Sequence, residues 1–236
     1  MVIRNRIVSL IYRIIAAIIG IFTIILIFYS DSANSFSWNP FRFLGTTVTI
    51  FSTFVLILEV LINGISFRSS SKRIFGIYGQ MLYVAVGLET ALAITQPIFY
   101  LFINGGDVSV SYFSADRIFT QLSLYIIFPI VVFFDWLLFS EKGNWKYHWI
   151  IYLLSIPLFY TAFSLLNHYI RTSTTFATAI FDNNTFLNYA ILGELNGWAG
   201  VIIASMTTLA IYITIGIGFV FLSNLLSGKY HRNPVI

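Results

Sequence analysis

The chain has 236 residues, of which 58% are hydrophobic and only 9% are charged. Soluble domains carry about 25% charged residues, so this composition excludes a water-soluble globular domain and a disordered chain. The absence of cysteine excludes disulfide-stapled folds and cysteine-based zinc or redox sites. The formal net charge of +4 does not indicate nucleic-acid binding, because the basic residues are spread along the borders of apolar segments. The sequence therefore predicts an integral membrane protein.

Six apolar segments are long enough to cross a bilayer, whose core of about 30 Å requires roughly 20 residues of helix. They lie at about 7–29, 43–65, 77–103, 118–140, 149–170 and 197–225. Long unbroken apolar runs favour helices over the alternating strands of a membrane β-barrel. We therefore expect an all-α fold, residues 1–236 forming one membrane domain. This domain is a bundle of six transmembrane helices, with a long outer loop at 171–196 before the last of them.

Lysine and arginine are concentrated on one side of these segments. Ten of them lie on that side: Arg4, Arg6, Arg13, Arg68, Lys72, Arg73, Lys142, Lys146, Lys229 and Arg232. Three lie on the other side: Arg42, Arg117 and Arg171. Since loops rich in these residues are retained in the cytoplasm, we expect a protein of the cell membrane with both termini cytoplasmic.

Four ionisable residues lie inside the expected spans: Arg13, Glu59, Glu89 and Asp135. A charge in the bilayer costs at least about 2.5–3.5 kcal/mol and normally faces a partner or a cavity. Arg13, Glu59 and Asp135 lie at a common depth of roughly 7–9 Å, counted at about 1.5 Å per residue from the cytoplasmic helix ends. We expect them to form an ion pair or triad that holds the first, second and fourth segments together. A proton or ion relay is the alternative.

Glu89 lies near the middle of the segment 77–103, and no basic residue is expected at its depth. One interpretation is a neutral carboxyl group that hydrogen-bonds to Thr90, Gln96 or a hydroxyl of the last segment. The other is a residue of a proton relay, because a lone ionisable group inside a membrane commonly marks a pathway.

The segment 43–65 carries a stripe of hydroxyl groups. Thr49, Ser52 and Thr53 follow one another at spacings that place them on one helix face, and Glu59 continues the stripe. Hydroxyl side chains in membrane helices typically bond to carbonyl groups of their own helix or to a neighbouring helix. The favoured interpretation of the stripe is therefore helix packing, and a polar site is the alternative interpretation.

His168 lies at the outer end of the segment 149–170. Side chains tilt toward the N-terminus of their helix, and this segment runs opposite to the one that carries Thr49. The two side chains therefore lean toward each other along the membrane normal. An interfacial histidine is one interpretation of His168, and a contact with Thr49 is the other.

Two sequence patterns resemble a known family. The sequence YIIFP at 125–129 is followed by FFDWLLF at 133–139, and VTIFST lies at 48–53. These patterns resemble those of the bacterial six-helix membrane proteins related to the vertebrate androgen-induced membrane proteins. In that family the fourth helix reads roughly His-x-x-x-Pro and then Asp-Trp-Leu-Leu-Phe, and the second helix reads Phe-Thr-x-x-Ser-Asn.

The resemblance implies hydrolysis of lipid esters inside the membrane, by a threonine nucleophile in the second helix and a histidine base in the fourth. Thr49 matches the nucleophile, whereas Tyr125, or Leu124 if the alignment shifts by one residue, stands at the position of the histidine. A phenol titrates near 10 and is a poor base at neutral pH, so His168 would have to replace the base, or Tyr125 would donate a hydrogen bond to an oxyanion. The replaced histidine favours the alternative class, a non-catalytic membrane protein.

That alternative is one of two kinds of protein. The first is a carrier of a lipid or a small solute, which would use Glu89, and the second is a scaffold protein. No cofactor or metal site is expected, and the expected partners are membrane lipids rather than nucleic acid.

Overall fold

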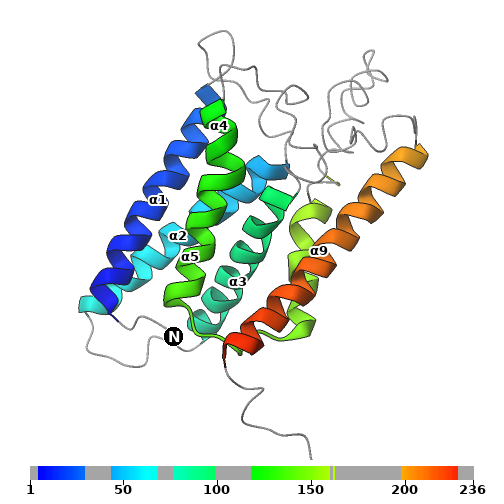
Figure 1. The fold of residues 1–236 in the computed structure, drawn as a ribbon. Helices are drawn as coiled ribbons and strands as arrows, with labels where there is room; N and C mark the ends of the chain where they lie inside the picture. The colour runs from blue at the N-terminus through cyan, green and yellow to red at the C-terminus, as the bar shows by residue number, and fades with distance from the viewer. Residues whose placement is uncertain are drawn as a thin grey trace, which may run out of the picture.

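The computed structural model describes residues 5–29, 44–68, 77–98, 118–159, 162 and 198–227. Within these ranges the chain is helical, with short connections and no strand, as the composition predicts (Figure 1). The elements are α1 (Arg6–Tyr29), α2 (Leu44–Arg68), α3 (Ile77–Ile98), α4 (Ile118–Leu122), the π-helical turn η5 (Ser123–Ile127), α5 (Phe128–Phe139), the 3-10 turn η6 (Tyr147–Trp149), α6 (Ile150–Leu153) and α9 (Trp198–Leu226).

Five helices of this part of the chain are long and apolar enough to cross a membrane. Their spans are Ile7–Phe28, Gly45–Gly64, Met81–Ile98, Phe119–Phe139 and Met206–Leu226. The expected span 149–170 is described only in part, as a shorter apolar helical segment, Tyr147–Phe159. The outer loop 171–196 and His168 lie outside the described residues.

The five long helices run side by side (Figure 1). On α1 a row of large apolar side chains is exposed: Ile7, Ile11, Ile14, Ile15, Ile18, Ile21, Phe22 and Ile25. The opposite face carries the small residues Ala16, Ala17 and Gly20 against α2 and α5. A side chain at Gly20 would collide with Thr53 and with the ring of Phe128. Small residues thus bring these helices close together, the usual basis of helix packing in membranes.

The fourth span is interrupted by the turn η5. Pro129 follows this turn and has no backbone N–H to donate to the carbonyl group four residues earlier. The N–H of Phe128, the residue before Pro129, donates to the carbonyl of Ser123, five residues earlier. A bond over five residues is π-helical geometry. Tyr125 lies in the middle of this turn.

A loop of residues 140–146 connects α5 to η6 and folds into one end of the bundle. Its Trp145 is 3% exposed and fills the space that a side chain at Gly87 of α3 would occupy. The ring centroid of Trp145 lies 5.2 Å from that of Phe219 in α9. The Gly143 N–H donates to Ser223 Oγ, also in α9, over 3.0 Å. The loop is therefore anchored between α3 and α9.

Candidate functional site

A buried ion triad joins three helices near the end of the bundle where α1 begins. Arg13 Nη2 lies 2.9 Å from Glu59 Oε1, and Arg13 Nε donates to Asp135 Oδ1 over 3.0 Å. Arg13 is 9% exposed, and both carboxylates are less exposed still. The structure thus brings together α1, α2 and α5 through the three residues that share a depth in the sequence. Both ion pairs are removed from water, so losing one partner would leave an uncompensated buried charge.

A second contact supports the approach of α1 to α5. The Tyr12 hydroxyl donates to the Val131 carbonyl over 2.9 Å, and the ring of Tyr12 lies 5.3 Å from that of Phe139. These contacts place the first part of α1 along α5. Arg13, the next residue, is therefore held within reach of Asp135.

Glu89 of α3 extends the triad to a fourth helix. It is 1% exposed, and it interacts electrostatically with Arg13, Glu59 and Asp135. The sequence places no basic residue at the depth of Glu89, and in the structure the charge of Arg13, which lies nearer its helix end, acts on Glu89. The partners expected for Glu89 bond elsewhere: Thr90 donates to its own helix and Gln96 donates to α2. We call Arg13, Glu59, Glu89 and Asp135 the charge cluster.

Two carboxylate oxygens of the charge cluster are buried without a hydrogen-bond donor, Glu59 Oε2 and Glu89 Oε1. A buried acceptor normally finds a donor, and one that does not is costly. Keeping two such oxygens buried in one cluster is therefore electrostatically unfavourable.

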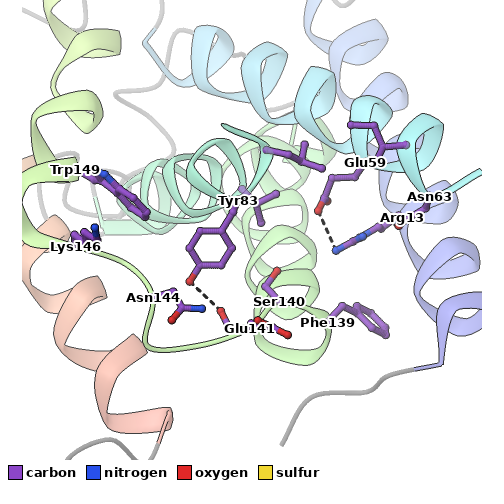
Figure 2. A pocket seen from close by; sticks show the side chains of 13 residues that line it. Arg13, Glu59, Asn63, Tyr83, Phe139, Ser140, Glu141, Asn144, Lys146 and Trp149 are labelled. Carbon is purple, nitrogen blue, oxygen red and sulfur yellow. Dashed lines mark hydrogen bonds and ion pairs between the residues drawn. The ribbon is translucent and has the colours of Figure 1, made fainter. Parts of the chain in front are cut away.

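A pocket of about 780 Å³ leads from the end of the bundle to the charge cluster (Figure 2). It lies between α2, α3, the end of α5 and the loop 140–146, and we call it the end pocket. Its lining residues are Arg13, Glu59, Ile62, Asn63, Leu82, Tyr83, Val86, Phe139, Ser140, Glu141, Asn144, Lys146 and Trp149. The volume lies in the range of small-molecule sites.

Aromatic and charged side chains alternate around the end pocket. The Tyr83 hydroxyl donates to the Glu141 carbonyl over 3.0 Å and so ties α3 to the loop (Figure 2). The ring of Tyr83 meets Trp149 edge to face at 6.2 Å. Lys146 Nζ lies 5.9 Å from the centre of the Trp149 ring, a cation–π contact. The pocket therefore combines a charged inner end with an aromatic wall.

Lys142 holds the loop to the end of α5. Its ammonium group donates to the carbonyl groups of Trp136, Leu137 and Ser140 and lies 4.6 Å from the centre of the Trp136 ring. A cation is well placed there, since the last carbonyls of a helix have no partners within it. Burial lowers the pKa of Lys142 to about 8, and the charge of Asp135 acts in the opposite direction.

Thr49, the expected nucleophile of a hydrolase, lies on a different part of α2 from Glu59. Thr49 is fully buried, and its Oγ1 accepts a hydrogen bond of 3.4 Å from Gln96 Nε2. Tyr125 packs against Gly45, one helical turn from Thr49, so the structure places these two close together. A carboxamide cannot accept a proton from a hydroxyl at neutral pH. His168, the expected substitute base, lies outside the described residues.

Several residues of the end pocket give no sign of a site in the sequence read alone. Tyr83 and Asn144 belong to no motif there, and Lys146 contributes only to the charge asymmetry. Asn63 offers one signal, because it follows Glu59 by four residues and so shares its helix face. A polar residue at that spacing inside an apolar segment indicates that the polar surface continues toward the helix end.

Comparison of the chain with protein-family models, with curated proteins and with solved structures finds no match.

Proposed function

We propose that this protein is a non-catalytic membrane carrier that binds a small solute in the end pocket and a proton in the charge cluster. The observation that carries the proposal is the position of Arg13 and Glu59, which line the pocket and also belong to a buried cluster of three carboxyl groups around one guanidinium. A solute in the pocket is thereby in electrostatic contact with groups that can exchange a proton.

The charge balance of the cluster supports proton binding. One guanidinium compensates one carboxylate, and each further charge inside a bilayer bundle costs several kcal/mol. The cluster has three carboxyl groups, two of which keep an oxygen without a donor. Protons are the smallest cations that can remove this excess charge without any rearrangement of the packing.

The proposed orientation of the protein in the membrane follows from the charge asymmetry of the sequence. With six membrane-crossing helices in a cell membrane and both termini in the cytoplasm, the end pocket opens to the cytoplasm. The charge cluster then lies between the cytoplasm and the middle of the membrane, a position suited to a gate or a relay.

A hydrolase is less well supported. Thr49 accepts a hydrogen bond from the Gln96 amide, and neither this amide nor the phenol of Tyr125 can take its proton at neutral pH. The ester-hydrolase hypothesis therefore depends on His168, and it stays a prediction.

Infrared spectroscopy of the purified protein in lipid nanodiscs tests proton binding. We expect the carbonyl stretch of buried carboxylic acids to disappear as the pH is raised, and we expect Glu89→Gln to lose part of this signal. Thr214→Val is the control, because Thr214 is exposed and its hydroxyl bonds to its own helix. A signal unchanged in both Glu89→Gln and Glu59→Gln would refute proton binding in the cluster.

A further inference from the structure

The end pocket and the groups behind it carry a surplus of negative charge. Four acidic residues act there, and they are Glu59, Glu89, Asp135 and Glu141. The cationic residues that the structure describes there are Arg13, Lys146 and Lys142, the last of which interacts with Asp135. The neighbouring phenols Tyr12 and Tyr83 are neutral and donate to backbone carbonyl groups. With all carboxylates ionised, these described residues leave one negative charge without a counter-charge.

This surplus discriminates between classes of solute. An anion would meet a net negative site, and the guanidinium of Arg13 is already engaged by Glu59 and Asp135. A cation would instead supply the missing charge. Glu59 faces the pocket as a carboxylate that is 3% exposed, and its Oε2 has no donor.

The wall of the end pocket is suited to an organic cation rather than a metal ion. Tyr83, Phe139 and Trp149 provide aromatic surface, and the ammonium of Lys146 already lies over the Trp149 ring. Aromatic rings attract ammonium groups through their negative faces. The pocket is also far larger than a single ion needs, at about 780 Å³. No group of three or more acidic or histidine side chains in the described ranges is arranged to hold a metal ion.

We propose that the solute is a small organic cation, an amine or quaternary ammonium compound with an apolar group, and that it competes with the proton for the charge cluster. The apolar group lies against Tyr83 and Trp149, and the ammonium group is directed toward Glu59. Since one positive charge balances the site, binding of the cation releases one proton. This inference rests on the proposed carrier function and specifies its substrate class.

Calorimetry with three probes of similar size tests the substrate class. Benzyltrimethylammonium, benzoate and benzyl alcohol are titrated into the wild-type protein in nanodiscs. We expect only the cation to bind, and lowering the pH by one unit should weaken it by up to about tenfold if one proton competes. Titrations in two buffers of different ionisation enthalpy should show one proton released per cation bound.

Two exposed side chains of opposite charge lie at the pocket mouth, and neutralising each of them should change the affinity for the cation in opposite directions. Glu141→Gln removes a negative charge and should weaken binding of the cation by about two- to fivefold, whereas Lys146→Gln should strengthen it by a similar factor. Both side chains are exposed, so neither change disturbs the packed core. Thr214→Val is again the control and should leave the affinity unchanged.

The outcomes separate this inference from the proposed function. Preferential binding of benzoate, or binding of none of the probes, overturns the substrate class, while the infrared signal of the buried carboxylic acids would still support proton binding. Binding of the cation without proton release overturns the competition. Affinity changes of the same sign in Glu141→Gln and Lys146→Gln would place the bound cation elsewhere.

Discussion

Arg13→Met should destabilise the protein strongly, because it removes the only guanidinium from a cluster of buried carboxyl groups. The side chain makes two ion pairs, of 2.9 Å to Glu59 and 3.0 Å to Asp135, and all three residues are at most 9% exposed. Solvent screening is therefore weak. Removing one partner of a buried ion pair costs about 3–5 kcal/mol, and most of this cost is the charge left behind.

The magnitude is checked by unfolding in mixed micelles of increasing SDS content, with helix content followed by circular dichroism. Arg13→Met is expected to lose about 3–5 kcal/mol of unfolding free energy. Arg13→Met combined with Glu59→Gln and Asp135→Asn should recover a large part of the loss, since it leaves no unpaired charge in the triad. Ile15→Leu, on the exposed face of α1, is the control. A loss below about 1 kcal/mol in Arg13→Met would show that the triad behaves as a solvated surface pair.

Three further predictions concern the loop, the helix contacts and the hydroxyl stripe. The pKa of Lys142 falls from 10.5 to about 8 on folding, so between these pH values the unfolded chain binds more protons than the folded protein. The unfolding free energy should therefore rise with pH over that interval. Lys142→Met should abolish this rise. Gly87→Ala should cost about 1–3 kcal/mol, because its Cβ would collide with the Trp145 indole, whereas Gly64→Ala meets no neighbour and should not destabilise. A fluorophosphonate probe should leave the wild type unlabelled, and labelling that disappears in Thr49→Ala would instead favour the hydrolase.

The ion triad illustrates what residue counting in a membrane protein can achieve. A helix rises by about 1.5 Å per residue, so the distance of Arg13, Glu59 and Asp135 from their helix ends translates directly into depth. Opposite charges at one depth in hydrocarbon have few alternatives to pairing. The counting gives the distance from a helix end but not the neighbours of each helix, and for this reason it did not connect Glu89 with Arg13.

The residues around Trp145 illustrate the opposite case. In the sequence, Trp145 and Lys142 belong to a short basic loop at the membrane border, where aromatic residues are common. Nothing in their spacing shows that Gly87, far away in the chain, leaves room for an indole ring. The loop therefore becomes one wall of the end pocket through a contact that depends on how α3 and α9 are packed.

The amino-acid sequence alone indicated an all-helical chain with apolar segments long enough to cross a membrane, and it placed Arg13, Glu59 and Asp135 at similar distances from their helix ends. It could do so because a bilayer imposes a length and a polarity on each segment independently of the others. The tertiary structure decided which helices are neighbours, and through them the contact of Glu89 with the triad, the position of Gln96 beside Thr49 and the end pocket. These features depend on side chains from different helices that meet across an interface, and such meetings follow from packing rather than from any periodicity along the chain.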